Sequence, residues 1–332
     1  MSEQAVEWPD VDVVMPIRNE AAGLADAVGA VRAQDYAGRV RILLGVGPSD
    51  DGTERIAARL AAHDDDLVVV ENPSGLTPAA LNVAIRAGAA PVIVRVDGHS
   101  HLSAGYIARA VETMRRTGAV NVGGMQVPVA TTPFEQAVAA ATTSWLGTGG
   151  ASYRVGGDAG PVDTVFLGVF DRDAIEAVGL FDERLVRNQD YELNIRLRKA
   201  GGTVWFDPEL SVGYRPRGSW RALAKQYYEY GRWKAAVMRL HPGSARARQV
   251  VPPVAIGAVA LSTILAKRWH VLAVVPLGYL AAVAVLGRPD RSGYRTVLVV
   301  PLIHVSWAAG VARGAAASAL EAPCPRRLRR HR

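Results

Sequence analysis

A short apolar run ends in an acid, a glycine and a histidine in the segment Pro91-Val-Ile-Val-Arg-Val-Asp-Gly-His-Ser100. The run Val92 to Val96 is typical of a buried strand, and ligands of an open α/β sheet gather beyond the carboxyl ends of its strands. Asp97 and His99 are therefore placed where they could share one divalent cation. A carboxylate with an imidazole suits a Mn²⁺-like ion, whose usual partner in such sites is a diphosphate. The alternative is a strand-ending aspartate that caps a turn beside a solvated histidine.

Asp190 is a second candidate acid. It lies at the start of Asn188-Gln-Asp-Tyr-Glu-Leu-Asn-Ile-Arg-Leu-Arg198, a segment whose apolar residues recur at helical spacing. The unpaired amide groups of a helix entrance favour a carboxylate, so a plain cap is the alternative to a catalytic role. Just upstream, Asp182 and Glu183 are interpreted as a loop that positions this acid, or as an exposed turn.

The elements that must position these acids alternate along the first hundred residues. Strands are predicted at 11–17, 41–46, 67–70 and 92–96, and a helical pattern follows each of the first three. Asn19 is the predicted N-cap of the first helix, and Pro78 falls in the first turn of the third. This alternation predicts an α/β fold with a mostly parallel sheet covered by helices on both faces.

The sequence then becomes less regular. From Gly123 to Gly160 it is rich in Gly, Thr and Ala, a composition that suits a mobile loop or an active-site lid. A further strand is predicted at 165–170 and a helix at 172–178.

The last part of the chain is strongly apolar. The runs Val250 to Ala266, Val271 to Gly287 and Val297 to Ala312 are each short of the roughly 20 residues that span a bilayer core. They predict two or three tilted spans, with an interfacial first segment and a buried helical subdomain as alternatives. Lys267-Arg268 leaves a tight connection between the first two runs. Because basic residues tend to stay in the cytoplasm, an even number of spans is favoured, with the soluble part and the basic tail both inside.

The composition of the chain indicates which kinds of partner and which cellular compartment to expect. The net charge of +7 includes five arginines in the tail Arg326-Arg-Leu-Arg-Arg-His-Arg332, which after apolar segments indicates anionic lipid headgroups and not nucleic acid. Cys324 is the single cysteine, so an intramolecular disulfide and a cysteine-rich metal site are excluded. The first ten residues do not resemble a signal peptide. We therefore expect a cell-membrane protein whose soluble part stays in the cytoplasm.

Several blocks, taken in order, resemble family 2 of the inverting glycosyltransferases, which have a GT-A (Rossmann-like) fold. Pro16-Ile-Arg-Asn-Glu20 is similar to the opening nucleotide-binding loop, Arg95-Val-Asp-Gly-His99 to the metal and diphosphate motif, and Asn188-Gln-Asp190 to the segment that bears the acceptor base. Gln226 with Arg232-Trp233 resembles the Gln-x-x-Arg-Trp element of processive relatives, with stretched spacing. The resemblance covers about residues 10 to 240 and is nearest to the succinoglycan-biosynthesis type, which builds lipid-linked or cell-envelope polysaccharide.

The resemblance implies an enzyme that moves a sugar from a nucleotide-sugar donor to a lipid-linked or polysaccharide acceptor. Asp97 and His99 would hold Mn²⁺ or Mg²⁺, and Asp190 would be the base, with Glu192 as the alternative. The implied donor-binding residues are Pro16, Arg18, Glu20, Asp51, Asn82, Asp97 and Arg232. For Arg232 and Trp233 a membrane anchor is the alternative. The implied domains are a catalytic domain at 1–240, membrane-associated helices at 241–320 and a basic tail at 321–332.

One departure concerns the nucleotide base. The family usually ends its second strand in one or two acids that hydrogen-bond uracil, whereas this chain has Val46 and Gly47 there. Asp51-Gly52-Thr53 matches the downstream helix start instead. A UDP-sugar is the first prediction, and a GDP-sugar competes with it.

Two other classes of protein are weighed against this one. A membrane-anchored, non-catalytic protein that binds a sugar nucleotide or glycan lipid would not need both Asp97 and Asp190. A nucleotidyltransferase would carry a Gly-rich phosphate loop with Arg or Lys near the first strand, and the sequence has none there.

Overall fold

The computed structural model describes residues 7–286 and 295–317, so Cys324 and the predicted basic tail lie outside the described residues. The chain divides into two compact units. The first comprises Met1–Thr131 and Thr142–Pro216, and the second comprises Thr132–Ala141 and Arg217–Arg332. In this division a short earlier segment joins the second unit, and the catalytic domain at 1–240 that the resemblance implied stays a prediction.

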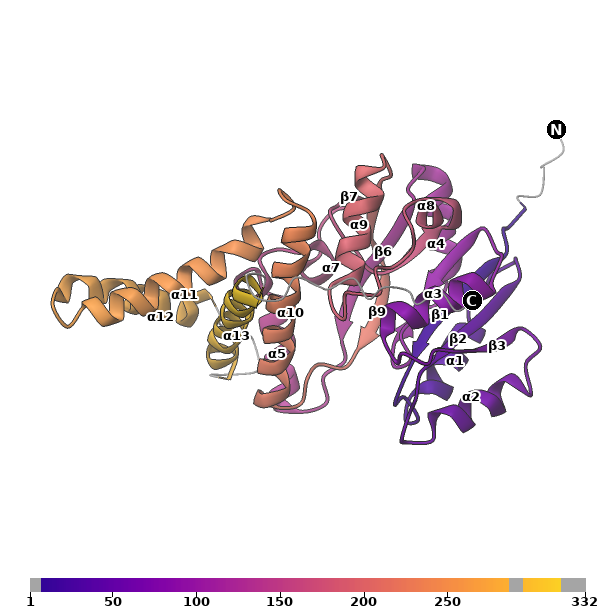
Figure 1. Ribbon diagram of the computed structural model, residues 1–332, viewed down its shortest axis with the longest axis horizontal. Helices are drawn as coiled ribbons and strands as arrows, with labels where there is room; N and C mark the ends of the chain where they lie inside the picture. Colours follow the sequence, from indigo (N-terminus) through magenta and orange to yellow (C-terminus); the bar gives the residue numbers. More distant parts are fainter. Residues whose placement is uncertain (1–6, 287–294, 318–332) are drawn as a thin grey trace, which may run out of the picture. The chain divides into compact units, whose positions relative to one another are not determined.

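The first unit is built on one sheet. In the described part of the chain it has nine strands in the order β3-β2-β1-β4-β8-β6-β9-β5, with β7 paired to β9 (Figure 1). The strands are β1 (Val11–Ile17), β2 (Val40–Val46), β3 (Leu67–Glu71), β4 (Val92–Arg95), β5 (His101–Leu102), β6 (Asn121–Pro128), β7 (Gly160–Pro161), β8 (Phe166–Asp171) and β9 (Val204–Tyr214).

The first four strands in sequence are parallel to one another, as the alternating pattern predicted. β8 then joins β4 antiparallel and pairs antiparallel with β6, while β6 and β9 are parallel. The sheet is therefore mixed beyond β4. This leaves the carboxyl ends of β1, β2 and β4 at one edge, where the loops that follow them meet.

Helices cover both faces of the sheet, as the alternation of side chains along β1 requires. Val13 and Met15 pack in the same core as residues of α1 (Leu24–Arg32), α2 (Thr53–Ala61) and α4 (Tyr106–Thr117). Val14 packs on the other face with residues of α3 (Thr77–Ala87), α8 (Arg172–Ala177) and α9 (Gln189–Lys199).

The expected loop or lid between Gly123 and Gly160 is wrong for its first residues, which form β6. A side chain at Gly124 would collide with the backbone of Leu210, and one at Gly123 would meet the side chain of Val165 at 2.8 Å. These glycines allow close strand packing, and they were misread as a sign of mobility. The short helices α6 (Trp145–Thr148) and α7 (Ser152–Val155) follow in this unit.

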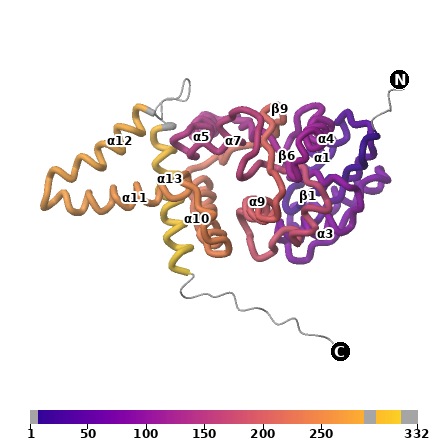
Figure 2. Tube along the Cα trace, turned by 90° about the horizontal axis from the view of Figure 1, so that it is seen from above, coloured from indigo at the N-terminus to yellow at the C-terminus, as the bar shows by residue number. Residues whose placement is uncertain are grey.

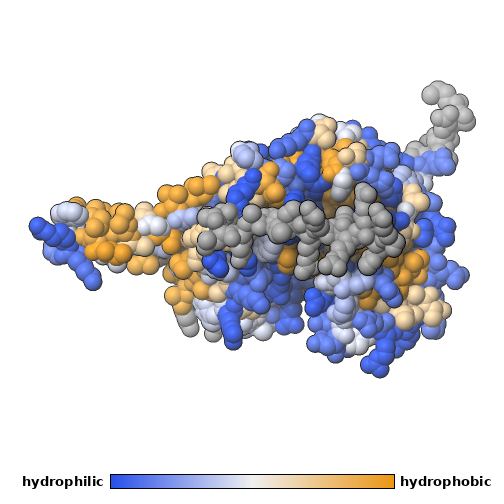
Figure 3. All heavy atoms as spheres, in the orientation of Figure 1, coloured by the Kyte–Doolittle hydropathy of each residue, from blue (hydrophilic) through white to orange (hydrophobic). Residues whose placement is uncertain are grey.

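The second unit is helical in its described residues. It contains most of α5 (Pro133–Thr142), then α10 (Trp220–Leu240), α11 (Ala247–Leu265), the 3₁₀ helix η1 (His270–Ala273), α12 (Val274–Leu286) and α13 (Arg295–Ala317). Within the described residues, Ala247–Leu265 and Val297–Ala317 are long and apolar enough to cross a membrane. Figure 2 shows α11 and α12 as a hairpin, and Figure 3 shows apolar residues over it.

Glycines set the contact between α10 and α13. A side chain at Gly231 would collide with the carbonyl of Trp307, and one at Gly310 with the carbonyl of Tyr228. A side chain at Gly314 would likewise collide with the carbonyl of Arg232. The two backbones therefore touch, as in close helix packing through small residues.

Candidate active site

The loops after β1 and β2 are joined by hydrogen bonds at the carboxyl edge of the sheet. The Asp51 carboxylate accepts from the backbone N–H of Ala21 at 3.0 Å and from the Thr53 hydroxyl at 2.5 Å. The bond from Thr53 is the main reason why the pKa of Asp51 lies below its usual value. The same hydroxyl accepts from the backbone N–H of Glu20 at 2.8 Å. Glu20 and Asp51, both predicted to bind the donor, thus lie at one rim.

Asn19 is not the N-cap of α1, which begins at Leu24 after Gly23. It adopts a left-handed backbone conformation (φ 54°), and its side-chain oxygen accepts from the backbone N–H of Asp50 at 3.1 Å. Its own N–H donates to the Ser49 hydroxyl. Asn19 therefore links the two loops, a role that helical periodicity alone does not reveal.

Arg18 and Pro16 complete this rim. Pro16 pairs with Gly45 in the parallel register of β1 and β2. The Arg18 guanidinium donates to the carbonyl of Gly75, in the loop after β3, at 3.2 Å. Gly47 packs against that loop as well, since a side chain there would meet the Cα of Gly75 at 3.0 Å. Close backbone packing is thus a physical reason for glycine where the family often has an acid.

Arg95 joins the two candidate acids. Its guanidinium is only 5% exposed because the pleat of β4 directs it to the face that α9 covers. Nε and Nη2 donate to Asp97 Oδ1 at 3.2 and 3.0 Å, and Nη1 donates to Asp190 Oδ1. Asp190 lies in the first turn of α9, as predicted. One buried cation therefore holds the two carboxylates at neighbouring positions.

Glu20 contacts the second predicted metal ligand. His99 Nδ1 lies 2.9 Å from Glu20 Oε1. A carboxylate at one ring nitrogen fixes the tautomer and orientation of a histidine whose other nitrogen ligates a metal. The ring of His99 is 57% exposed, so its side chain is accessible at the rim. Glu20, expected to contact the nucleotide, is thus placed to orient His99.

Asp97 and His99 fit a divalent cation that is shared with a substrate. Within residues 7–286 and 295–317, no group of three or more Asp, Glu, His or Cys side chains could hold a metal ion alone. Mg²⁺ and related ions are commonly held by one or two protein groups together with substrate phosphates. The Asp97 side chain is 23% exposed, and its second oxygen and the imidazole supply donors of the right type.

Glu192, the alternative base, and Asp182, a further nearby acid, are both engaged elsewhere. The Glu192 carboxylate is 3% exposed and accepts from Arg196 at 2.8 and 2.7 Å, whereas Asp190 is 36% exposed. Hydrogen bonds from Arg184 hold the pKa of Asp182 below its usual value, which weakens it as a proton acceptor. Asp190 therefore remains the best-placed base of the three, and this role stays a prediction.

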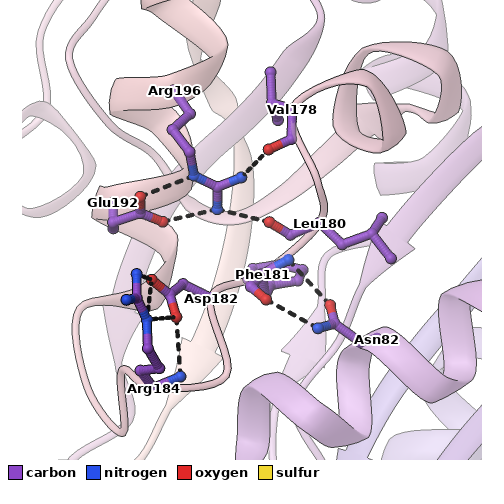
Figure 4. A network of polar contacts seen from close by, with 8 residues as sticks. All are labelled: Asn82, Val178, Leu180, Phe181, Asp182, Arg184, Glu192 and Arg196. Carbon is purple, nitrogen blue, oxygen red and sulfur yellow. Dashed lines mark hydrogen bonds and ion pairs between the residues drawn. The ribbon is translucent and has the colours of Figure 1, made fainter. Parts of the chain in front are cut away.

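Asn82 clamps the loop that precedes α9. Figure 4 shows its amide facing the backbone of Phe181, to which it donates at 2.9 Å and from which it accepts at 3.0 Å. It also donates to Glu183 at 2.8 Å, and the residue is 2% exposed. Its predicted contact with the nucleotide has no support in this geometry, because the amide is buried and used for the loop.

The same loop is held from the other side. Arg196 donates to the carbonyls of Val178 and Leu180, the latter at 2.6 Å (Figure 4). Leu180 has a left-handed backbone (φ 61°), a strained conformation for a residue with a branched side chain. Bonds to the backbone on both sides keep the loop in this shape.

Arg232 belongs to α10 in the second unit, where its guanidinium lies 5.9 Å from the ring of Trp233. Its binding to the donor stays a prediction.

Arg95 is the site residue that sequence reasoning missed, although it was quoted within the metal motif. A charge inside an apolar, buried strand needs a buried partner, and that signal was present.

This fold is shared with a solved glycosyltransferase. The mannosyltransferase PcManGT from Pyrobaculum calidifontis, solved in complex with GDP-Man and Mn²⁺, superimposes with a TM-score of 0.61 at 18% identity. The match covers 93% of this chain and 88% of that one. The first unit therefore has the GT-A, Rossmann-like architecture that the motifs implied.

Sequence comparison identifies the family. Residues 12–179 match the family model described as Glycosyl transferase family 2. The succinoglycan biosynthesis protein ExoA of Rhizobium meliloti (strain 1021) is 32% identical over 308 residues, which are 90% of this chain and 92% of that protein. Glycosyltransferase AglE of Haloferax volcanii is 26% identical over 72% of this chain and 77% of its own length. The chain belongs to glycosyl transferase family 2 and is a glycosyltransferase.

Proposed function

We propose that the protein transfers a sugar from a nucleotide-sugar to a glycan acceptor with inversion at the anomeric carbon. The observation that carries this proposal is the pair of carboxylates on one buried guanidinium, Asp97 and Asp190 on Arg95. A single displacement needs a donor-binding group and a base in one site, and these two acids can divide that work.

Each group has a defined task in this proposal. Asp190 accepts the proton of the acceptor hydroxyl while that oxygen bonds to the anomeric carbon and the bond to the diphosphate breaks. Asp97 and His99 would hold Mn²⁺ or Mg²⁺, which supplies Lewis-acid neutralisation of the leaving diphosphate. Arg95 keeps both carboxylates in place, and Glu20 keeps the His99 ring oriented.

The donor we propose is a UDP-sugar, with a GDP-sugar as the competitor. The fold neighbour PcManGT was solved with GDP-Man and Mn²⁺, and GalNAc-T7, which has a TM-score of 0.50 to this chain, was solved with UDP, GalNAc and Mn²⁺. Val46 and Gly47 stand where the family often has acids that read uracil, so the chain lacks there a side chain that would favour UDP over GDP.

The acceptor we propose is a lipid-linked or cell-envelope polysaccharide. Its support is the likeness to ExoA, a protein named for succinoglycan biosynthesis, and the apolar helices that follow the catalytic unit. With these helices in the cell membrane, the catalytic unit would lie in the cytoplasm, where nucleotide-sugars are made.

Hydrolysis of a panel of UDP- and GDP-sugars by the purified full chain tests this proposal. We expect one donor to be cleaved with Mn²⁺ or Mg²⁺ and not with a chelator, and Asp97→Ala to lose metal-dependent donor binding while its unfolding temperature is preserved. Asp50→Ala, at an exposed acid of the same rim, is the matched control. Binding of a donor without any turnover would favour the non-catalytic alternative, and full activity of Asp97→Ala in chelator would overturn the assignment of the metal.

A further inference from the structure

The hairpin of α11, η1 and α12 exposes apolar side chains along both arms. Val254, Leu261 and Ile264 on α11, and Leu277, Leu280 and Val285 on α12, are between 56% and 66% exposed. Only 11% of the apolar window of α11 is buried. An exposed apolar surface that extends along both arms indicates a site of contact with a membrane or with another protein.

The tip of the hairpin is polar. Lys267, Arg268, Trp269 and His270 connect the arms and are exposed. Figure 3 shows hydrophilic residues at this end and an apolar band next to it. Basic side chains and tryptophan favour the headgroup level of a bilayer, which suits a lipid and not a protein groove.

The length of α11, the longer arm, matches a bilayer core, whereas the apolar stretch His270–Val285 of the other arm is shorter. α11 has 19 residues, which at the rise of an α-helix extend about 28 Å, against a hydrocarbon thickness of about 30 Å. At the other end of α11, Arg239, Arg246 and Arg248 outnumber the two basic residues Lys267 and Arg268 of the tip. This excess places the α10 end on the side that retains basic residues.

α13 does not continue the hairpin as a third arm. It runs across the open end of the hairpin in Figure 2, where Trp307 Nε1 donates to the carbonyl of Gln249 at 3.0 Å. On the other arm, the Tyr279 hydroxyl lies 3.0 Å from His304 Nδ1. The apolar window of α13 is 39% buried, against 11% for that of α11. The glycines of α13 also pack it closely against the charged helix α10.

We propose that the α11–α12 hairpin is the part of the described chain that inserts into a phospholipid bilayer, with its basic tip at the headgroups of the far leaflet. α13 stays at the near interface as the support of the hairpin, although its length and composition would allow it to span. Within the described residues the chain then crosses twice, and the end of α13 lies on the side of the catalytic unit. This rests on the membrane association proposed above but not on the sugar-transfer reaction.

Labelling of single cysteines with a membrane-impermeant maleimide tests this topology. In the full chain with Cys324→Ser, cysteines are placed at exposed positions of the first unit, the tip and the end of α13, as Asp173→Cys, Arg268→Cys and Arg313→Cys. We expect sealed vesicles of one orientation to label Asp173→Cys and Arg313→Cys, and vesicles of the other orientation to label Arg268→Cys. Permeabilised vesicles verify that each thiol reacts.

Other patterns overturn the proposal. Label on Arg313→Cys from the side of Arg268→Cys means that α13 spans, and label on Arg268→Cys from the side of Asp173→Cys means that the hairpin does not cross. Recovery of the full chain without detergent, for instance as a dimer, also overturns it. A chain without transferase activity would still give a labelling pattern, so failure of the proposed reaction is distinguishable.

A matched pair of substitutions tests which helix inserts into the bilayer. Leu277→Arg on α12 and Leu298→Arg on α13 replace leucines that are 63% and 54% exposed. We expect Leu277→Arg to lower the fraction bound to phosphatidylcholine–phosphatidylglycerol vesicles several-fold more than Leu298→Arg. Equal loss in both variants, or a larger loss in Leu298→Arg, would contradict the assignment.

Discussion

Asp97 and Asp190 accept hydrogen bonds from the same guanidinium, that of Arg95, although they belong to motifs far apart in the chain. The arginine is nearly buried while both acids are partly exposed. A buried cation with two acidic partners fixes their separation more firmly than two independent surface pairs would. In the reaction proposed above, donor binding and proton removal would thereby be linked through one side chain.

Arg95→Lys should impair both functions at once. Lysine keeps the charge, but its compact ammonium cannot reproduce a planar fork that bonds two carboxylates. Loss of a charge-assisted hydrogen bond costs about 1.5–3 kcal/mol, so we expect kcat to fall ~10–100-fold and the Mn²⁺ concentration for half-maximal rate to rise. Steady-state kinetics over a metal titration measure both quantities.

The unfolding temperature of Arg95→Lys separates positioning from folding. If the two kinetic changes persist in protein that unfolds at nearly the wild-type temperature, Arg95 acts through the acids. A change in kcat alone, with normal metal dependence, would contradict the linkage to Asp97.

Asp190→Asn should collapse kcat and spare donor affinity. Asparagine preserves size and most hydrogen bonds but cannot accept a proton at neutral pH, and loss of a general base typically costs about 10²- to 10⁴-fold in rate. Glu192→Gln is the control, because that carboxylate is buried on Arg196 and should affect stability more than kcat per folded molecule. Wild-type kcat in Asp190→Asn, together with a collapsed kcat in Glu192→Gln, would move the base to Glu192.

Glu20→Gln should weaken metal binding without removing a ligand. The amide is a poorer partner for His99 Nδ1 than a carboxylate, and loss of such an outer partner typically costs about 10–100-fold in metal affinity. Isothermal titration with Mn²⁺ in the presence of UDP or GDP would measure this. Glu71→Gln, at an exposed glutamate at the end of β3, should bind Mn²⁺ normally. Normal affinity in Glu20→Gln would mean that Glu20 does not orient His99.

Gly310→Leu should destabilise the second unit. A side chain there meets the backbone of Tyr228 and Arg232, so α10 and α13 must separate, and overpacking typically costs about 1–3 kcal/mol. Gly257→Leu on α11 is the matched control, because no atom lies within 4 Å of a side-chain carbon placed at that position. Thermal unfolding in detergent should show a lower midpoint for Gly310→Leu only. Equal midpoints would mean that the helix contact is not tight.

The parallel half of the sheet could be predicted from the sequence because its signals are local. Strands of Val, Ile and Leu end in turn residues, and helices of 3.6-residue period follow them. The strand that contains Gly123 and Gly124 could not be recognised in this way. Glycine is needed there because the backbone packs closely against Val165 and Leu210, which lie far away in sequence.

The site was predictable in its residue types but not in its connections. Asp97, His99 and Asp190 stand in recognisable segments, whereas the bonds from Arg95 and Glu20 depend on which strand neighbours which helix and loop. The amide of Asn82 shows the same limit. Its type suits nucleotide binding, but the fold turns it toward the backbone of Phe181.

The clamp on the loop before α9 acts mainly on backbone atoms, since Asn82 and Arg196 bond the main chain of residues 178, 180 and 181. Asp182 belongs to both the main-chain framework and the surface of this loop, because its carboxylate bonds the Arg184 guanidinium and also accepts from the backbone N–H of Arg184 at 3.0 Å. The Arg184 side chain, in contrast, bonds only the Asp182 carboxylate among the contacts of this loop. Residue 184 is consequently the place where a designer, or drift between relatives, can vary what an incoming molecule meets without having to rebuild the main chain beneath it.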